Sequence, residues 1–367
     1  MADTKTLTAQ CYCKAVHFTV TLPTASLPLK VHLCGCSICR YTHGTLSVFH
    51  ATLPDRIAPQ FVAPSSAAHL TGYRHAAARS ERFFCSTCGC AIGDVSVEQG
   101  TEGEWNVASS IFADHSEANF LINSHCLTDC LPGGPGAGGF EQLLPRLGDR
   151  ELTVWNPAKD DSEWNMAVVE SAPEVDAEGR ERLRAQCHCG GVAFTLPRPT
   201  VPAVTDDPYL RKWISPVDES KWIATLDACN DCRLVNGTHA IPWTFVPRAL
   251  LEPPMPRALA PYGTMKAFAS SEGVLRGFCG TCGATVVYSC DDRVPTEAQA
   301  VIDVAVGVLR APEGVLAEKW LTWRTGRLGW PECGMQYDEV FTKSLEKGLA
   351  EWGERRHGKA LDFQVGV

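Results

Sequence analysis

The chain has 367 residues, of which 45% are hydrophobic and 20% charged, so it is globular and long enough for two domains with their own cores. A formal net charge of −9, without any Lys/Arg run, disfavours nucleic acid and anionic membrane surfaces as partners. The N-terminal residues lack the apolar core of a signal peptide, and no 18-residue apolar run occurs. We therefore expect a soluble, cytoplasmic protein.

The first part of the chain is predicted to be mostly β. Cys11 and Cys13 precede residues 16–22, whose alternation of apolar and polar side chains is typical of a half-buried strand. Residues 45–50 are a second short strand, and residues 107–112 and 120–122 add apolar segments.

Between these strands stand Cys34, Cys36 and Cys39, which a turn can aim at one point. Three thiolates leave a tetrahedral zinc ion one ligand short, and an open position is the usual mark of a site that handles water or substrate. This stretch is therefore the candidate reaction centre. Further along, Cys85 and Cys88 form a C-x-x-C-G knuckle.

The chain repeats itself. Residues 186–195 resemble residues 10–19, residues 276–283 resemble residues 82–89 and, between them, Cys229 and Cys232 match Cys36 and Cys39. The repeat indicates a tandem duplication. The change in offset from 176 to 193 predicts a 17-residue insertion between Cys189 and Cys229, which would contain Trp213 and Trp222.

The repeat predicts copy one at residues 7–130, a Gly/Pro-rich linker at 131–182, copy two at 183–335 and a C-terminal extension at 336–367. We place the boundary near residue 172, and expect residues 174–184 to form a short helix. The two copies could pack as an internal pseudo-dimer.

Thirteen of the 18 cysteines fall into clusters with the spacing of metal ligands. A disulfide framework, the alternative, belongs to oxidising compartments and small secreted domains. Each copy offers a four-sulfur set that would close the shell of a structural zinc ion: Cys11, Cys13, Cys85 and Cys88 in copy one, and Cys187, Cys189, Cys279 and Cys282 in copy two.

The central cluster differs between the copies. Copy one has Cys34, Cys36 and Cys39, whereas copy two offers Asp227, Cys229 and Cys232. Asp227 is either a ligand or a solvated loop residue, so copy two is the weaker or inactive centre. We therefore predict two structural zinc ions and one or two labile ones.

Other candidates have a structural alternative. His43 and His50 flank the reactive loop and are either acid/base groups or packed histidines. Arg40 and Arg233 share one repeated position, which suits a structural ion pair as well as a substrate contact. The cysteines outside the repeat are interpreted as small apolar residues: Cys90, Cys126, Cys130, Cys290 and Cys333.

The pattern C-x-C, then C-x-C-x-x-C-R with a following Gly, then F-C-x-x-C-G resembles the glutathione-dependent formaldehyde-activating enzyme family, which includes centromere protein V. Copy one matches every cysteine, and copy two departs from the pattern at Asp227. The resemblance implies small, mostly β domains stitched by a four-cysteine zinc site, with a reactive zinc on Cys34, Cys36 and Cys39.

The family resemblance also implies carbon–sulfur lyase chemistry on a thiol adduct of a small carbonyl compound, with glutathione as a candidate co-substrate, or related chemistry on another metabolite. The alternative is a non-catalytic zinc module that binds a protein partner, as centromere protein V does. The absence of a basic or low-complexity tail in the sequence favours the enzyme.

Overall fold

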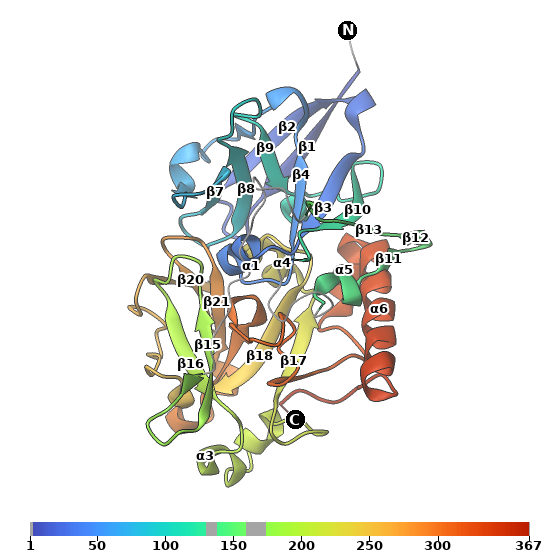
Figure 1. Cartoon of the computed structure of the whole chain (residues 1–367). Helices are drawn as coiled ribbons and strands as arrows, with labels where there is room; N and C mark the ends of the chain where they lie inside the picture. Colours follow the sequence, from blue (N-terminus) through green and yellow to red (C-terminus); the bar gives the residue numbers. More distant parts are fainter. Residues whose placement is uncertain (1–2, 130–137, 159–173, 367) are drawn as a thin grey trace.

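A computed structural model describes residues 3–129, 138–158 and 174–366 (Figure 1). The described residues are mostly β, as the sequence predicts. None of their helices is both long and apolar enough to cross a membrane. The predicted domain boundary near residue 172, most of the glycine run at 131–139, and Cys130 lie outside the described residues.

A small antiparallel sheet begins each copy. In copy one it consists of β1 (Thr4–Gln10), β2 (His17–Pro23) and β5 (Gln60–Phe61). The apolar side chains of β2 alternate into the core, so the strand predicted at 16–22 is confirmed. The turn between β1 and β2 carries Cys11 and Cys13.

The corresponding sheet of copy two contains β14 (Glu174–Val175), β15 (Glu181–Gln186) and β16 (Ala193–Pro197). The helix predicted at 174–184 is therefore wrong. Leu183 and Ala185 alternate with polar neighbours and are buried, so β15 packs with a period of two. The charge pattern that suggested a helix belongs to the exposed face of a strand.

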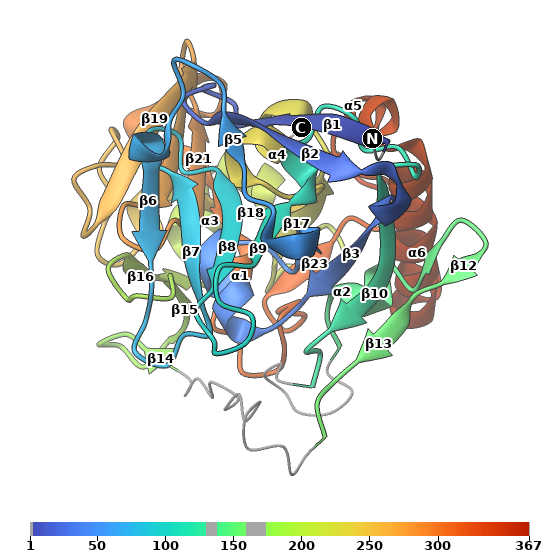
Figure 2. The same cartoon turned by 90° about the horizontal axis from the view of Figure 1, so that it is seen from above.

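Two large sheets hold most of the core, and their strands lie in the same order. Figure 2 shows β6, β7 and β8 of the first sheet side by side. The first runs β6-β7-β8-β9-β4-β3-β10-β13 and the second β19-β20-β21-β22-β18-β17-β23. The first comprises β6 (Leu70–Tyr73), β7 (Ser80–Cys85), β8 (Ala91–Ser96), β9 (Trp105–Ala108), β4 (Val48–Thr52), β3 (Leu29–Cys34), β10 (Phe120–Cys126) and β13 (Thr153–Trp155). The second comprises β19 (Met265–Ser271), β20 (Val274–Cys279), β21 (Thr285–Cys290), β22 (Val301–Ala305), β18 (Ile241–Pro247), β17 (Trp222–Asp227) and β23 (Leu321–Trp323).

The segment before Cys229 contains α3 (Pro202–Thr205) and a 3-10 turn, Leu210–Trp213. Trp213 thus lies in the extra segment, as predicted. Trp222 instead begins β17, which occupies the position of β3 in the sheet order, so its assignment to the insertion is wrong.

The described residues of the segment predicted as linker form regular structure. They form α2 (Phe140–Leu143), β11 (Arg146–Leu147), β12 (Arg150–Glu151) and β13, and β13 pairs with β10. The chain ends with α5 (Pro331–Tyr337) and α6 (Glu339–His357), and α6 packs beside α2 and β11 (Figure 1). Gly348 of α6 makes this possible, because a Cβ there would lie 2.2 Å from the Leu143 carbonyl oxygen. The C-terminal extension therefore packs on the segment that follows copy one.

The helices α1 (Ser37–His43) and α4 (Asn230–Asn236) lie where the two copies meet (Figure 1). Gly44 and Gly237 end them with positive φ angles of 76° and 70°. A Cβ on Gly44 would lie 2.0 Å from the Thr285 carbonyl oxygen, and one on Gly237 would lie 2.3 Å from that of Ala91.

Other contacts between the copies are also reciprocal. The Tyr12 amide donates to the Leu234 carbonyl at 3.1 Å, and the His188 amide donates to the Tyr41 carbonyl at 2.9 Å. These residues occupy equivalent places in the repeat. Phe84 and Phe278, which are also equivalent, meet edge to face with centroids 6.3 Å apart. Each copy therefore uses the same surface to contact the other.

We predict that Gly44→Ala destabilises the protein more than Gly358→Ala. Both glycines end helices with nearly the same left-handed backbone, but a Cβ on Gly358 meets nothing within 4 Å. Gly358→Ala should cost about 1–2 kcal/mol for the backbone alone, and Gly44→Ala a further ~1–3 kcal/mol for the close approach to Thr285. The free energy of unfolding of each variant is measured by urea denaturation, provided that the m value stays that of the wild type. Equal losses would contradict the backbone contact between the copies.

Candidate metal centres and active site

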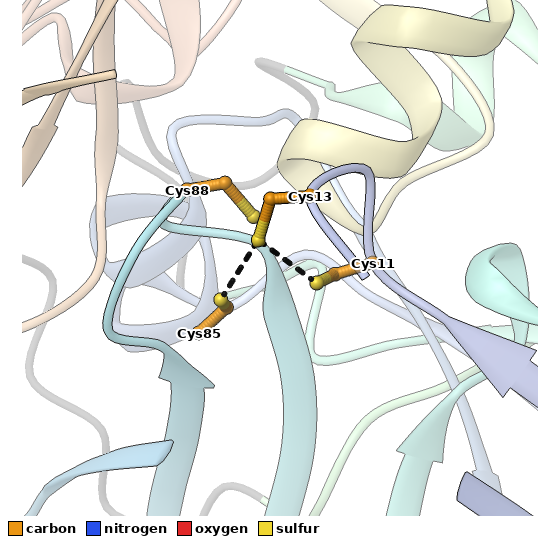
Figure 3. A group of neighbouring side chains, drawn as sticks. All are labelled: Cys11, Cys13, Cys85 and Cys88. Carbon is orange, nitrogen blue, oxygen red and sulfur yellow. Dashed lines mark hydrogen bonds between the residues drawn. The ribbon is translucent and has the colours of Figure 1, made fainter. Parts of the chain in front are cut away.

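Two distant turns of copy one bring four sulfurs together (Figure 3). Cys11 and Cys13 come from the turn between β1 and β2, and Cys85 and Cys88 from the turn between β7 and β8. The Sγ atoms of Cys11 and Cys13 are 3.5 Å apart, and those of Cys13 and Cys85 are 3.6 Å apart. Gly89, with φ of 80°, supplies the tight turn after the knuckle.

Copy two builds the same arrangement from Cys187, Cys189, Cys279 and Cys282. Its Sγ separations are 3.6 Å for Cys187–Cys189 and 3.4 Å for Cys189–Cys279. Backbone amides point at these sulfurs: Val192 N lies 3.3 Å from Cys187 Sγ and Cys282 N lies 3.4 Å from Cys279 Sγ. Such donors stabilise negative charge on sulfur.

These separations fit metal ligands and do not fit disulfides. A disulfide bond is about 2.05 Å long, whereas four sulfurs at about 2.3 Å from one tetrahedral ion are roughly 3.8 Å apart. Each buried four-sulfur group could thus hold a thiophilic metal ion, and the sequence-predicted ligands are together in both copies.

The three cysteines of the reactive loop also meet. Cys34 ends β3, Cys36 is the N-cap of α1 and Cys39 lies in its first turn. The Cys36 sulfur accepts from the Cys39 amide at 3.4 Å. Hydrogen bonding to Cys126 and Cys36, and then burial, raises the pKa of the Cys34 thiol well above its usual value. A nearby cation is therefore needed to make this cluster anionic, as the ligand role requires.

Arg82 of β7 provides one positive charge, with Nη2 3.9 Å from Cys39 Sγ. Its equivalent in copy two, Arg276, has Nη1 3.4 Å from Cys232 Sγ. Both arginines begin repeated segments of the sequence, 82–89 and 276–283. Their identical placement before F-C-x-x-C was the available signal of a role beside the sulfurs.

In copy two, Asp227, Cys229 and Cys232 form a group with ligand atoms within 4.8 Å of one another. Asp227 Oδ1 accepts from the Cys229 amide at 2.7 Å, so the carboxylate is held toward the loop. The group is compatible with Asp227 as a ligand, which stays a prediction. The exchange of thiolate for carboxylate makes the donor set harder than in copy one.

A cavity of about 1010 Å³ opens onto the three-sulfur group of copy one. Copy two contributes Gln186, His188 and Arg310 to its wall, so neither copy encloses this cavity alone. Its size is at the upper end of small-molecule sites. Cys126, interpreted from the sequence as a packed apolar residue, also lines it and hydrogen-bonds Cys34.

His50 faces this cavity and is held by a carboxylate. Its Nδ1 lies 3.1 Å from Asp94 Oδ2, and Asn106 donates to Asp94 Oδ1 at 3.1 Å. Burial would raise the pKa of Asp94, but hydrogen bonding and charge from His50, with Arg82, hold that pKa below its usual range. The buried Nε2 of His50 has no hydrogen-bond partner among the described residues.

His43 is a packed histidine. Its Nδ1 lies 3.0 Å from the Cys39 carbonyl oxygen, and burial, followed by His50 and Arg82, lowers its pKa to about 3. Arg40 and Arg233 also have structural contacts: Arg40 Nε donates to the Gly35 carbonyl at 3.0 Å and Arg233 Nη1 to the Ser110 carbonyl at 2.5 Å. Of the two alternatives left open for this position, an ion pair is not found for either arginine among the described residues.

The fold and the site define a β domain with a buried four-sulfur group and a separate three-sulfur centre facing a cavity. Residues 6–126 match the family model described as glutathione-dependent formaldehyde-activating enzyme. A search of curated proteins finds no match.

We predict that Cys85→Ser removes about one metal ion per chain and prevents stable folding. A closed structural site contributes on the order of 10 kcal/mol to folding, and this one joins turns 72 residues apart. Cys333→Ser is the control, because Cys333 is half-buried in α5 and outside the sulfur groups. Metal content and thermal midpoint are measured. A Cys85→Ser protein with wild-type stability would show that these sulfurs hold no structural ion.

Proposed function

We propose that the chain is a zinc-dependent enzyme that makes or breaks the carbon–sulfur bond of a thiol adduct of a small carbonyl compound, with glutathione as the thiol. The observation that carries the proposal is the three-sulfur group of Cys34, Cys36 and Cys39 at the wall of a large cavity. Zinc, when bound there, supplies a positive charge that holds a substrate sulfur as thiolate.

The surrounding residues supply what a thiol–carbonyl condensation needs besides the ion. The sulfur–carbon bond forms as the carbonyl π electrons move to oxygen, the thiol loses a proton and the oxygen gains one. His50 Nε2 is the atom we assign to that proton, because His50 lines the cavity and this nitrogen has no hydrogen-bond partner among the described residues. Asp94 fixes the imidazole through Nδ1, which leaves Nε2 as the nitrogen that can exchange a proton.

The cavity also suits an anionic thiol. Arg82 of copy one and Arg310 of copy two both line it, with His75 and His188 beside them. Arg310 stacks over Tyr41 with its guanidinium carbon 3.2 Å from the ring centroid, which fixes its position. We propose that this basic side binds the carboxylates of glutathione.

The second copy lacks the same catalytic groups. Trp243 stands at the strand position of His50, and Tyr288 at that of Asp94. Arg293 lies over the rings of Trp213, Phe245 and Tyr288, at 5.3 to 5.6 Å, and forms an ion pair with Asp303. We infer that the chain is a tandem duplication packed as an internal pseudo-dimer, in which copy two retains the fold and completes the cavity wall.

We predict that Cys36→Ser and Cys39→Ser abolish turnover, while Cys229→Ser and Cys232→Ser reduce it far less. The first pair belongs to the centre that faces the cavity, whereas the second belongs to the harder, mixed donor set. All four variants should stay folded, because each cluster lies within one short loop. Turnover with glutathione and formaldehyde, zinc content and thermal midpoints are measured.

Equal loss of turnover in both pairs would show that the Asp227 centre is catalytic. A wild-type protein with intact metal centres and no turnover would favour the alternative function, a zinc module that binds a protein partner like centromere protein V.

We predict that His50→Gln lowers kcat by about 10²–10⁴ with little change in thermal midpoint, because glutamine can still donate to Asp94 but cannot carry a proton. His32→Gln is the control. His32 pairs with His50 across β3 and β4 and lines the same cavity, but no carboxylate bonds to it among the described residues. The kcat of both variants is measured by steady-state kinetics over a range of pH. Similar losses for both variants would rule out His50 as the proton carrier.

A further inference from the structure

A second kind of side-chain cluster lies away from the cysteine groups, where three parts of the chain meet. His115 follows β9 in copy one, His239 follows α4 in copy two, and Asp338 separates α5 from α6 in the C-terminal extension. None of the three belongs to a cysteine motif or to a repeated segment. Their nearest ligand atoms lie within 4.8 Å of one another.

The distances between the three ligand atoms have the size that a bound ion requires. His115 Nδ1 lies 2.9 Å from Asp338 Oδ2, His239 Nε2 lies 3.4 Å from His115 Nδ1, and His239 Nε2 lies 3.8 Å from Asp338 Oδ2. A tetrahedral ion with bonds of about 2.0–2.1 Å separates its nitrogen and oxygen ligands by roughly 3.3–3.4 Å. The three distances bracket that value, so one ion could contact all three atoms after small shifts.

In each of these side chains, the nitrogen or oxygen that points away from the cluster already has a hydrogen-bond partner. His115 Nε2 lies 3.2 Å from Ser109 Oγ, and His239 Nδ1 lies 2.7 Å from Ser110 Oγ. Each imidazole can therefore donate its outer N–H to a serine hydroxyl and keep a lone pair on the inner nitrogen. This is the usual arrangement of metal-bound histidines. Asp338 Oδ1 accepts from the Phe341 amide at 2.9 Å, which leaves Oδ2 for the ion.

Hydrogen bonding alone satisfies this cluster incompletely. His115 Nδ1 can donate to only one partner, and Asp338 is the nearest. The inner nitrogen of His239 is then left with a 3.4 Å contact to a ring nitrogen already engaged by the carboxylate. Both histidine side chains are 1% exposed, so bulk solvent does not reach this nitrogen. A buried polar atom without a good partner costs about 1–3 kcal/mol.

The wall around the cluster is aromatic. His239 stacks on Phe49 at 4.4 Å, His115 stacks on Phe120 at 5.0 Å, and the Tyr337 ring lies beside both histidines. A polar ligand set inside an apolar shell is typical of protein metal sites. Asp338, with 13% of its side chain exposed, provides the edge through which an ion can enter.

We propose that His115, His239 and Asp338 bind a divalent first-row cation, with zinc as the ion to be tested, and that this ion fastens both copies to the C-terminal helix. Two imidazoles and one carboxylate are a donor set that zinc accepts readily. The site occurs once per chain, because Leu46 occupies the position in copy one that His239 occupies in copy two. It lies apart from the catalytic proposal, and neither depends on the other.

The test is the zinc content of the purified, full-length protein and of two variants, His239→Gln and Asp338→Asn. Each variant should contain one zinc fewer per chain than wild type and have a lower thermal midpoint that added zinc no longer raises. Asp338→Asn guards against misfolding, because asparagine is as good an N-cap as aspartate and should preserve the start of α6. His125→Gln is the matched control, since His125 is 2% exposed and bonds the Leu144 carbonyl at 2.8 Å, outside the cluster.

A second measurement separates this site from the cysteine centres. In cobalt-substituted protein, the wild-type spectrum minus that of Asp338→Asn should contain ligand-field bands without thiolate-to-cobalt charge transfer. Folded Asp338→Asn protein with the full wild-type complement of zinc, or a difference spectrum dominated by charge transfer, would overturn the proposal and leave a buried hydrogen-bonded cluster.

Discussion

The backbone-to-backbone contact between the two copies is the constraint on which the rest of the structure depends. At Gly44 and Gly237 each copy presses a helix end against a carbonyl of the other, and no side chain fits in either place. This approach brings Gln186, His188 and Arg310 to the cavity that the loop of Cys34, Cys36 and Cys39 faces. A single copy would have the three sulfurs but only part of the wall. The cavity therefore depends on both halves of the chain.

The sulfur groups divide into two roles by their connections. The four-sulfur groups join turns that are distant in the chain, so an ion there would add a long-range cross-link to the fold. The three-sulfur group lies within one loop and the first turn of α1, and it ties down little beyond that loop. A metal site that joins distant parts of the chain stabilises the fold, whereas a metal site with three protein ligands beside a cavity leaves a position for a substrate. The cluster of His115, His239 and Asp338 resembles the four-sulfur groups in this respect, because its three residues come from distant segments of the chain.

The divergence of copy two follows a consistent pattern. Asp227 replaces Cys34, Trp243 replaces His50 and Tyr288 replaces Asp94, while the four-sulfur ligands and Arg276 are unchanged. The replaced residues surround the place where copy one has its cavity, and the retained ones support the fold. Large aromatic side chains in that place add buried apolar area, which strengthens the core at the expense of a binding site.

Much of this protein is determined by the sequence alone, because metal ligands and repeats are local patterns. The spacing of the cysteines predicted which sulfurs lie together, and the alternation of apolar and polar residues at 16–22 predicted β2. The helix predicted at residues 174–184 was wrong. The segment is charged, and the apolar face of its strand is covered only in the folded domain, so the local sequence does not distinguish this strand from a helix. Tertiary structure alone decided the rest. His50 meets Asp94 through the pairing of β4, β9 and β8, and Arg310 reaches the cavity through the contact between copies. His115, His239 and Asp338 are separated by 124 and 99 residues, so only the packing of both copies against α6 brings them together.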